Sequence, residues 1–137
     1  MGQLNELQIK AAQPRDKEYM LSDGDPPAFN RQLTDRNSQY DNLLKPAIRL
    51  IKCWNAANGY VFDSYMLEKW IVGNLYWTCS NLRDYVFEIF DDMSPRGGSV
   101  RNRERVSRAQ QRVKTIRALE AASDFRRAEQ EAARLIP

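Results

Sequence analysis

Apolar residues recur at helical intervals in one segment of this chain after another. The clearest run, with spacings of three and four residues, is Leu44, Ala47, Ile48, Ile51 and Trp54. This period places the side chains on one face of a helix, and such a face has to be buried against other elements. Pro46 is tolerated best in a first turn, which puts the helix start near Lys45, and Asn58-Gly59 marks its end. The chain is therefore expected to build a packed helical core.

Two further helices are predicted after this one. Asp63 or Ser64 can cap the first of them, and Gly73 is not expected to end it. The residues predicted to face the core from it are Leu67, Trp70, Ile71 and Leu75. After Ser80-Asn81 the apolar pattern resumes and runs to Phe90, so two helices are favoured over a single long one.

The C-terminal part predicts a helical hairpin. The segment from Ser94 to Ser99 is a loop by composition. The apolar positions of the next helix are Val106, Ala109, Val113, Ile116 and Leu119. Ser123 or Asp124 can cap a final helix, which then runs antiparallel to the one before it.

The whole pattern predicts an all-α fold, a bundle of four to six helices. Residues 1–35 are interpreted as an N-terminal arm and loop, and residues 36–137 as the helical domain. A short strand or extended arm around Lys17 to Leu21 is the one candidate exception to the helical class, because no segment alternates over the length of a strand.

Composition excludes several classes of function. The chain contains no histidine, so catalytic triads and zinc sites that depend on histidine are ruled out, and no catalytic or metal-binding residue is predicted. Cys53 and Cys79 lie in apolar helical patterns and are interpreted as buried thiols, like the three tryptophans Trp54, Trp70 and Trp77. No apolar run reaches the roughly 20 residues of a membrane span, and no secretory signal is visible, so a cytoplasmic protein without a membrane partner is expected.

Two short motifs lie in the centre of the chain. The first helix carries Arg49, Lys52 and Trp54, and after a short loop comes Ser64-Tyr65-Met66-Leu67-Glu68. This order resembles the C-terminal helical domain of the oligoadenylate synthetase and cyclic GMP-AMP synthase superfamily, which includes the bacterial cyclic-oligonucleotide synthases of antiphage defence. The alanine-rich segment from Ile116 to Ile136 is similar to the closing hairpin of that family, so the resemblance covers about residues 17–137.

The resemblance implies a binding site for a nucleoside triphosphate, ATP or GTP. It assigns phosphate binding to Lys52 and stacking on the base to Tyr65, with Arg49 as a second basic candidate. From the residues alone, Lys52 is a solvated side chain and Ser64 is a helix cap, although a capped helix start also offers amide donors to phosphate. Tyr65 can equally pack in the core.

The catalytic half of the family has no counterpart in this sequence. Asp23-Gly24-Asp25 lies in turn sequence, and Asp91-Asp92 is interpreted as a solvated helix end, so neither supplies the acidic pair that holds two metal ions in the family. The chain alone is therefore expected to be inactive and to bind no cofactor. Mg²⁺ is expected with a catalytic nucleotidyltransferase domain, supplied in cis or in trans.

A basic run provides an alternative function. From Arg96 to Arg117 only Glu104 opposes eight basic residues, and no aromatic residue lies among them. Such a run can attract a nucleic-acid backbone, with Arg101, Arg105, Arg108 and Arg112 as the candidate face. A solvated helix face is the preferred interpretation, and on it these four charges are expected to be dispensable for folding. A plain protein-interaction domain is the third possibility.

Overall fold

The computed structural model describes residues 26–94 and 98–137, and these form six helices and no strand. The helices are α2 (Pro26–Gln39), α3 (Leu44–Ala57), α4 (Ser64–Gly73), α5 (Leu82–Asp92), α6 (Val100–Ala121) and α7 (Phe125–Leu135). The all-α class is confirmed. The predicted strand or arm lies outside the described residues, as does Asp23-Gly24-Asp25. No described helix has the length and apolar character that crossing a membrane requires.

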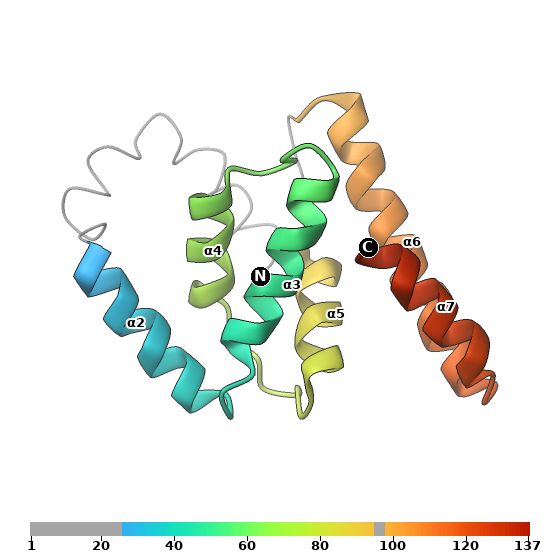
Figure 1. Cartoon of the computed structure of the whole chain (residues 1–137), viewed down its shortest axis with the longest axis horizontal. Coiled ribbons are helices and arrows are strands. Elements are labelled where there is room, and N and C mark those ends of the chain that lie inside the picture. The colour runs from blue at the N-terminus through green and yellow to red at the C-terminus, as the bar shows by residue number, and fades with distance from the viewer. Residues whose placement is uncertain (1–25, 95–97) are drawn as a thin grey trace.

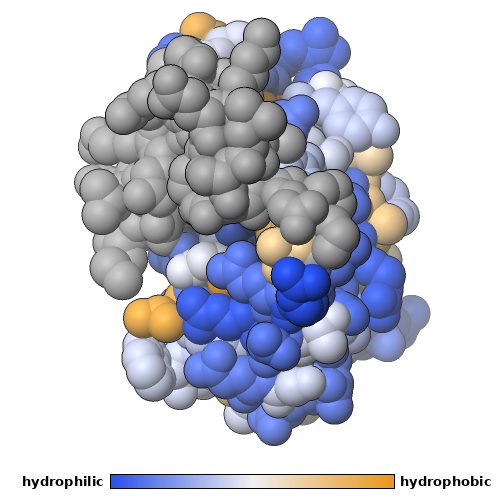
Figure 2. Space-filling view, turned by 90° about the vertical axis from the view of Figure 1, so that its left-hand side faces the viewer, coloured by the Kyte–Doolittle hydropathy of each residue, from blue (hydrophilic) through white to orange (hydrophobic). Residues whose placement is uncertain are grey.

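The three central helices α3, α4 and α5 are flanked on both sides (Figure 1). α2 packs against α3 and α4, and α6 packs against α5 on the opposite side. α7 turns back along α6, so the predicted antiparallel hairpin is confirmed. The outer face of α2 is hydrophilic where it is visible (Figure 2), in keeping with the exposed side chains of Arg31, Gln32 and Asp35. Phe29 of the same helix is buried.

α3 follows the predicted stripe closely. Its stripe residues are all buried, and Ile51 is fully enclosed. The helix ends as predicted at Asn58 and Gly59, because the Tyr60 amide donates to Asn55 O at 2.8 Å and the Gly59 amide to Ala56 O at 3.1 Å. These bonds satisfy two of the carbonyls at the end of the helix, and the φ of 75° at Gly59 makes them possible.

Several sequence predictions are wrong. α2 begins at Pro26, so the predicted loop is partly helical and the boundary between residues 35 and 36 falls inside a helix. α4 ends at Gly73, so the helical spacing of apolar residues does not continue beyond it. Leu75 and Trp77, which were expected to be buried, are 38% and 81% exposed. Cys53 lies on the exposed side of α3, whereas Cys79 is half-buried.

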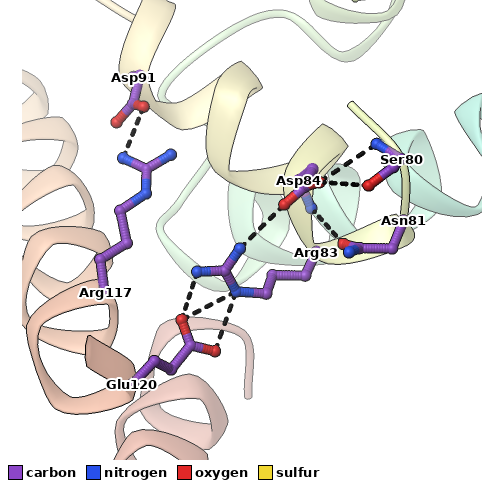
Figure 3. Close-up of polar contacts among 7 residues, drawn as sticks. All are labelled: Ser80, Asn81, Arg83, Asp84, Asp91, Arg117 and Glu120. Atoms are coloured by element: carbon purple, nitrogen blue, oxygen red, sulfur yellow. Dashed lines mark hydrogen bonds and ion pairs between the residues drawn. The ribbon is translucent and has the colours of Figure 1, made fainter. Parts of the chain in front are cut away.

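The break between α4 and α5 is confirmed. Asn81 caps α5 by accepting from the Asp84 amide at 2.9 Å, and Asp84 in turn accepts from the Ser80 amide and hydroxyl (Figure 3). The hydrogen bond from the Ser80 amide lowers the pKa of Asp84. Local polar groups therefore begin this helix independently of α4.

Charged side chains join α5 to the hairpin (Figure 3). Arg83 Nε lies 3.0 Å from both carboxylate oxygens of Glu120, and Arg117 Nη1 lies 2.8 Å from Asp91 Oδ2. Both guanidinium groups lie over the buried ring of Phe87, at 4.6 Å and 5.3 Å from its centroid. These contacts fix α6 on α5 with charge pairs and cation–π stacking around an apolar centre.

Candidate functional site

The two motifs of the sequence lie on neighbouring helices that contact each other. Lys52 of α3 places its Nζ 3.3 Å from Glu68 Oε2 of α4. The lysine side chain is 43% exposed and the glutamate 17% exposed, so the ammonium is accessible to solvent while the carboxylate is largely covered. The first motif therefore presents a cation beside the second.

Ser64 is the first residue of α4, and its predicted capping role is wrong. Asp63 is the cap, and its Oδ1 accepts from the Met66 amide at 3.0 Å. Ser64 and Glu68 are four residues apart on the helix, and positions with this spacing share one face. Ser64 thus lies one turn from the Lys52–Glu68 pair, toward the N-terminus of α4, where helix geometry favours anions.

Tyr65 is half-buried. Its ring meets Phe29 edge to face, with centroids 5.3 Å apart and an interplanar angle of 73°, and the Lys69 ammonium lies 5.5 Å from its centroid. This packing provides the structural role that the sequence left open for Tyr65. Arg49 is exposed on α3, three residues before Lys52.

The loop between the two helices, residues 58–63, is called the connector below. Asn55 is fully buried at the end of α3, and its side-chain amide bonds both backbone groups of Phe62. Nδ2 donates to Phe62 O at 2.8 Å, and Oδ1 accepts from Phe62 N at 3.0 Å. These two hydrogen bonds fix the end of the connector that leads into Asp63 and Ser64.

The basic run is not a uniform solvated face. Arg105 donates to the carbonyl oxygen of Asn58, and Arg112 Nη1 lies 3.0 Å from Glu131 Oε2 of α7. Arg101 and Arg108 are exposed as expected. Arg105 and Arg112 contact other elements, so the fully solvated face expected from the sequence is wrong at these two positions. That the four charges are dispensable for folding stays a prediction. Arg96 lies outside the described residues.

Acidic residues gather on the second half of α5. Burial raises the pKa of Glu88, and the neighbouring charges of Asp92 and Asp91 raise it further. Asp91 is exposed and paired with Arg117, whereas Asp92 is half-buried, and burial raises its pKa too. Within residues 26–94 and 98–137, no group of acidic or sulfur side chains is arranged to hold a metal ion.

The chain matches no protein-family model, no curated protein and no solved structure. Sequence reasoning missed the roles of Asn55 and Arg105. A polar residue inside an apolar stripe was a usable signal for Asn55, because a buried amide needs hydrogen-bond partners. Arg105 gave no such signal, since seven other basic residues surround it in the sequence.

Proposed function

We propose that α3 and α4 bind the triphosphate of ATP or GTP as the non-catalytic helical part of a template-independent nucleotidyltransferase. The observation that supports this most directly is the contact between the two motifs, in which Lys52 Nζ lies 3.3 Å from Glu68. Two motifs that the family resemblance links are thereby joined on one surface, with Ser64 one helical turn away. Tyr65 is the candidate for contact with the base.

Lys52 is expected to bind a triphosphate more strongly than it binds Glu68. An ion pair whose ammonium is open to solvent, like that of Lys52, contributes only about 0–1 kcal/mol, whereas a hydrogen bond to a charged group contributes about 1.5–3 kcal/mol. A triphosphate carries several negative charges and can therefore displace Glu68 from Lys52. The N-terminus of α4 adds the positive end of a helix dipole next to the same position.

The catalytic step belongs to a second domain in this proposal. Phosphoryl transfer depends mainly on positioning and on neutralising charge, so a domain that only orients the nucleotide contributes to the rate. The partner domain would supply the acidic pair and its Mg²⁺, which activate the attacking hydroxyl and stabilise the leaving pyrophosphate. Bacterial cyclic-oligonucleotide synthesis in antiviral defence is the corresponding setting.

The test is a calorimetric titration of the 137-residue chain with ATP and GTP, with and without Mg²⁺. Lys52→Ala is expected to weaken binding at least about tenfold. Lys114→Ala, which removes another exposed lysine, from α6, is expected to change it less than about twofold. Glu68→Gln is expected to strengthen binding by up to about fivefold, because it removes the competing carboxylate. Equal effects of the two lysine variants would contradict the proposed site.

A turnover assay tests the division between the two domains. The chain incubated with ATP, GTP and Mg²⁺ is expected to release no pyrophosphate, because its sequence holds no counterpart of the acidic pair. Release that persists after removal of contaminating enzymes would refute the non-catalytic role. Nucleic-acid binding by α6 has weaker support, since Arg105, Arg112 and Arg117 all contact residues of the chain itself.

A further inference from the structure

The connector is held at both of its ends by side chains that lie outside it. Asn55 bonds Phe62 near the start of α4, and Arg105 donates to the carbonyl oxygen of Asn58 at the end of α3. Arg105 belongs to α6 and is 47 residues away from Asn58 in the sequence. The hairpin therefore contacts the segment that separates Lys52 from Ser64.

The backbone at Gly59 is adapted to this arginine. A methyl group at Gly59 would lie 3.1 Å from Arg105 Nη1, closer than ordinary van der Waals contact, and the φ of 75° at this residue already favours glycine. The last carbonyls of a helix carry partial negative charge, so a guanidinium placed on the Asn58 carbonyl is electrostatically favourable. The half-buried side chain of Arg105 strengthens that interaction relative to one in open solvent.

We propose that Arg105 is a positioning residue for the nucleotide site, an inference that rests on the proposed function. Arg105 itself contacts no nucleotide. It fixes Asn58 and Gly59, which determine the path of the connector from the helix that carries Lys52 to the helix that begins at Ser64. A nucleotide held between Lys52 and Ser64 binds best when the separation of these two residues is already set. Groups that are held in place before binding pay a smaller free-energy cost for becoming ordered.

Three variants of the full chain test this role. Arg105→Met keeps an unbranched apolar stem and removes the charge and the donors, and Arg105→Lys keeps the charge and a donor. Arg108→Met is the matched control, because it removes the same charge from an exposed position of the same helix. Affinity for ATP is measured by titration, and hydrogen exchange is measured at the amides of residues 58–63.

We expect Arg105→Met to weaken ATP binding about tenfold and to accelerate exchange in the connector. Arg105→Lys is expected to recover most of the affinity, and Arg108→Met to leave both readouts near those of the unaltered chain. If Arg105→Met does not fold, Arg105→Lys tests the positioning role instead. The amides of the connector must then exchange as slowly in Arg105→Lys as in the unaltered chain. Unchanged ATP affinity in Arg105→Met, or equal losses in Arg105→Met and Arg108→Met, would overturn the positioning role alone. Absence of ATP binding by the unaltered chain would overturn the proposed function as well.

Discussion

Replacing the fully buried Asn55 by alanine tests the two hydrogen bonds that hold the end of the connector. The substitution removes two hydrogen bonds, of 2.8 and 3.0 Å, and leaves the N–H and C=O of the buried Phe62 without these partners. Each unsatisfied buried group costs about 1–3 kcal/mol, and water that enters the vacated space recovers part of this loss. We therefore expect the free energy of unfolding to fall by about 3 kcal/mol, which corresponds to a thermal midpoint lowered by roughly 10 °C.

Urea unfolding, followed by tryptophan fluorescence and by circular dichroism, measures this loss. A midpoint shift of about 1.5 M urea is expected at a typical slope of about 2 kcal/mol per M, with coincident transitions from the two probes. Asn58→Ala is the matched control, because it removes a single part-buried side-chain bond, to Trp54 O, from a residue three positions along the chain. Its cost is expected to stay below about 1 kcal/mol. If Asn55→Ala costs no more than Asn58→Ala, the connector is not held by this amide.

Two further predictions concern pH and thiol chemistry. Burial, together with Asp92 and Asp91, raises the pKa of Glu88 in the folded chain above its value in the unfolded chain. The folded state therefore loses stability as pH rises from the pKa of Glu88 in the unfolded chain through its pKa in the folded chain. Glu88→Gln should then raise the thermal midpoint by roughly 1–3 °C at pH 7 and have no effect near pH 3. Thermal melts over a series of pH values measure this, with Glu129→Gln, at an exposed position, as the control. Burial and the charge of Glu88 raise the pKa of Cys79 to about 11, and Cys53 is exposed, so iodoacetamide at pH 8 should alkylate Cys53 well before Cys79, as peptide mass spectrometry will show. Faster labelling of Cys79 would contradict this order.

Helices were predictable from the sequence where the periodic stripe and the end signal agree. α3 has both, with buried Ile51 in the stripe and Asn58-Gly59 at the end. α2 was missed because Pro26-Pro27 is typical of a turn, although proline is equally compatible with the first turn of a helix. Trp77 was misplaced because the period was extended past Gly73, where the helix ends and the backbone of Asn74 becomes extended.

The candidate site was only partly accessible to the same reasoning. The family resemblance singled out Lys52, and the helix start drew attention to Ser64, because both rest on short local motifs. The sequence could not predict that Glu68 is the partner of Lys52, since that pair depends on how two helices pack. The contact from Arg105 to Asn58 was even less predictable, because it joins residues that are 47 positions apart. Its acceptor is a backbone carbonyl, which every residue has and which therefore leaves no signal in the sequence.

This difference has a physical basis that also bears on function. Apolar stripes specify that helices pack together, but cores tolerate many hydrophobic substitutions of similar volume, so the stripe pattern alone does not specify the relative position of two helices. Polar groups in covered positions are directional, because a donor is satisfied only where its acceptor lies. In this chain Asn55 and Arg105 provide such directional contacts, and both act on the connector between Lys52 and Ser64. A phosphate contact requires Lys52 and Ser64 to be placed to within a fraction of an ångström. The geometry of the proposed site therefore depends in part on directional bonds for which the sequence gives little signal.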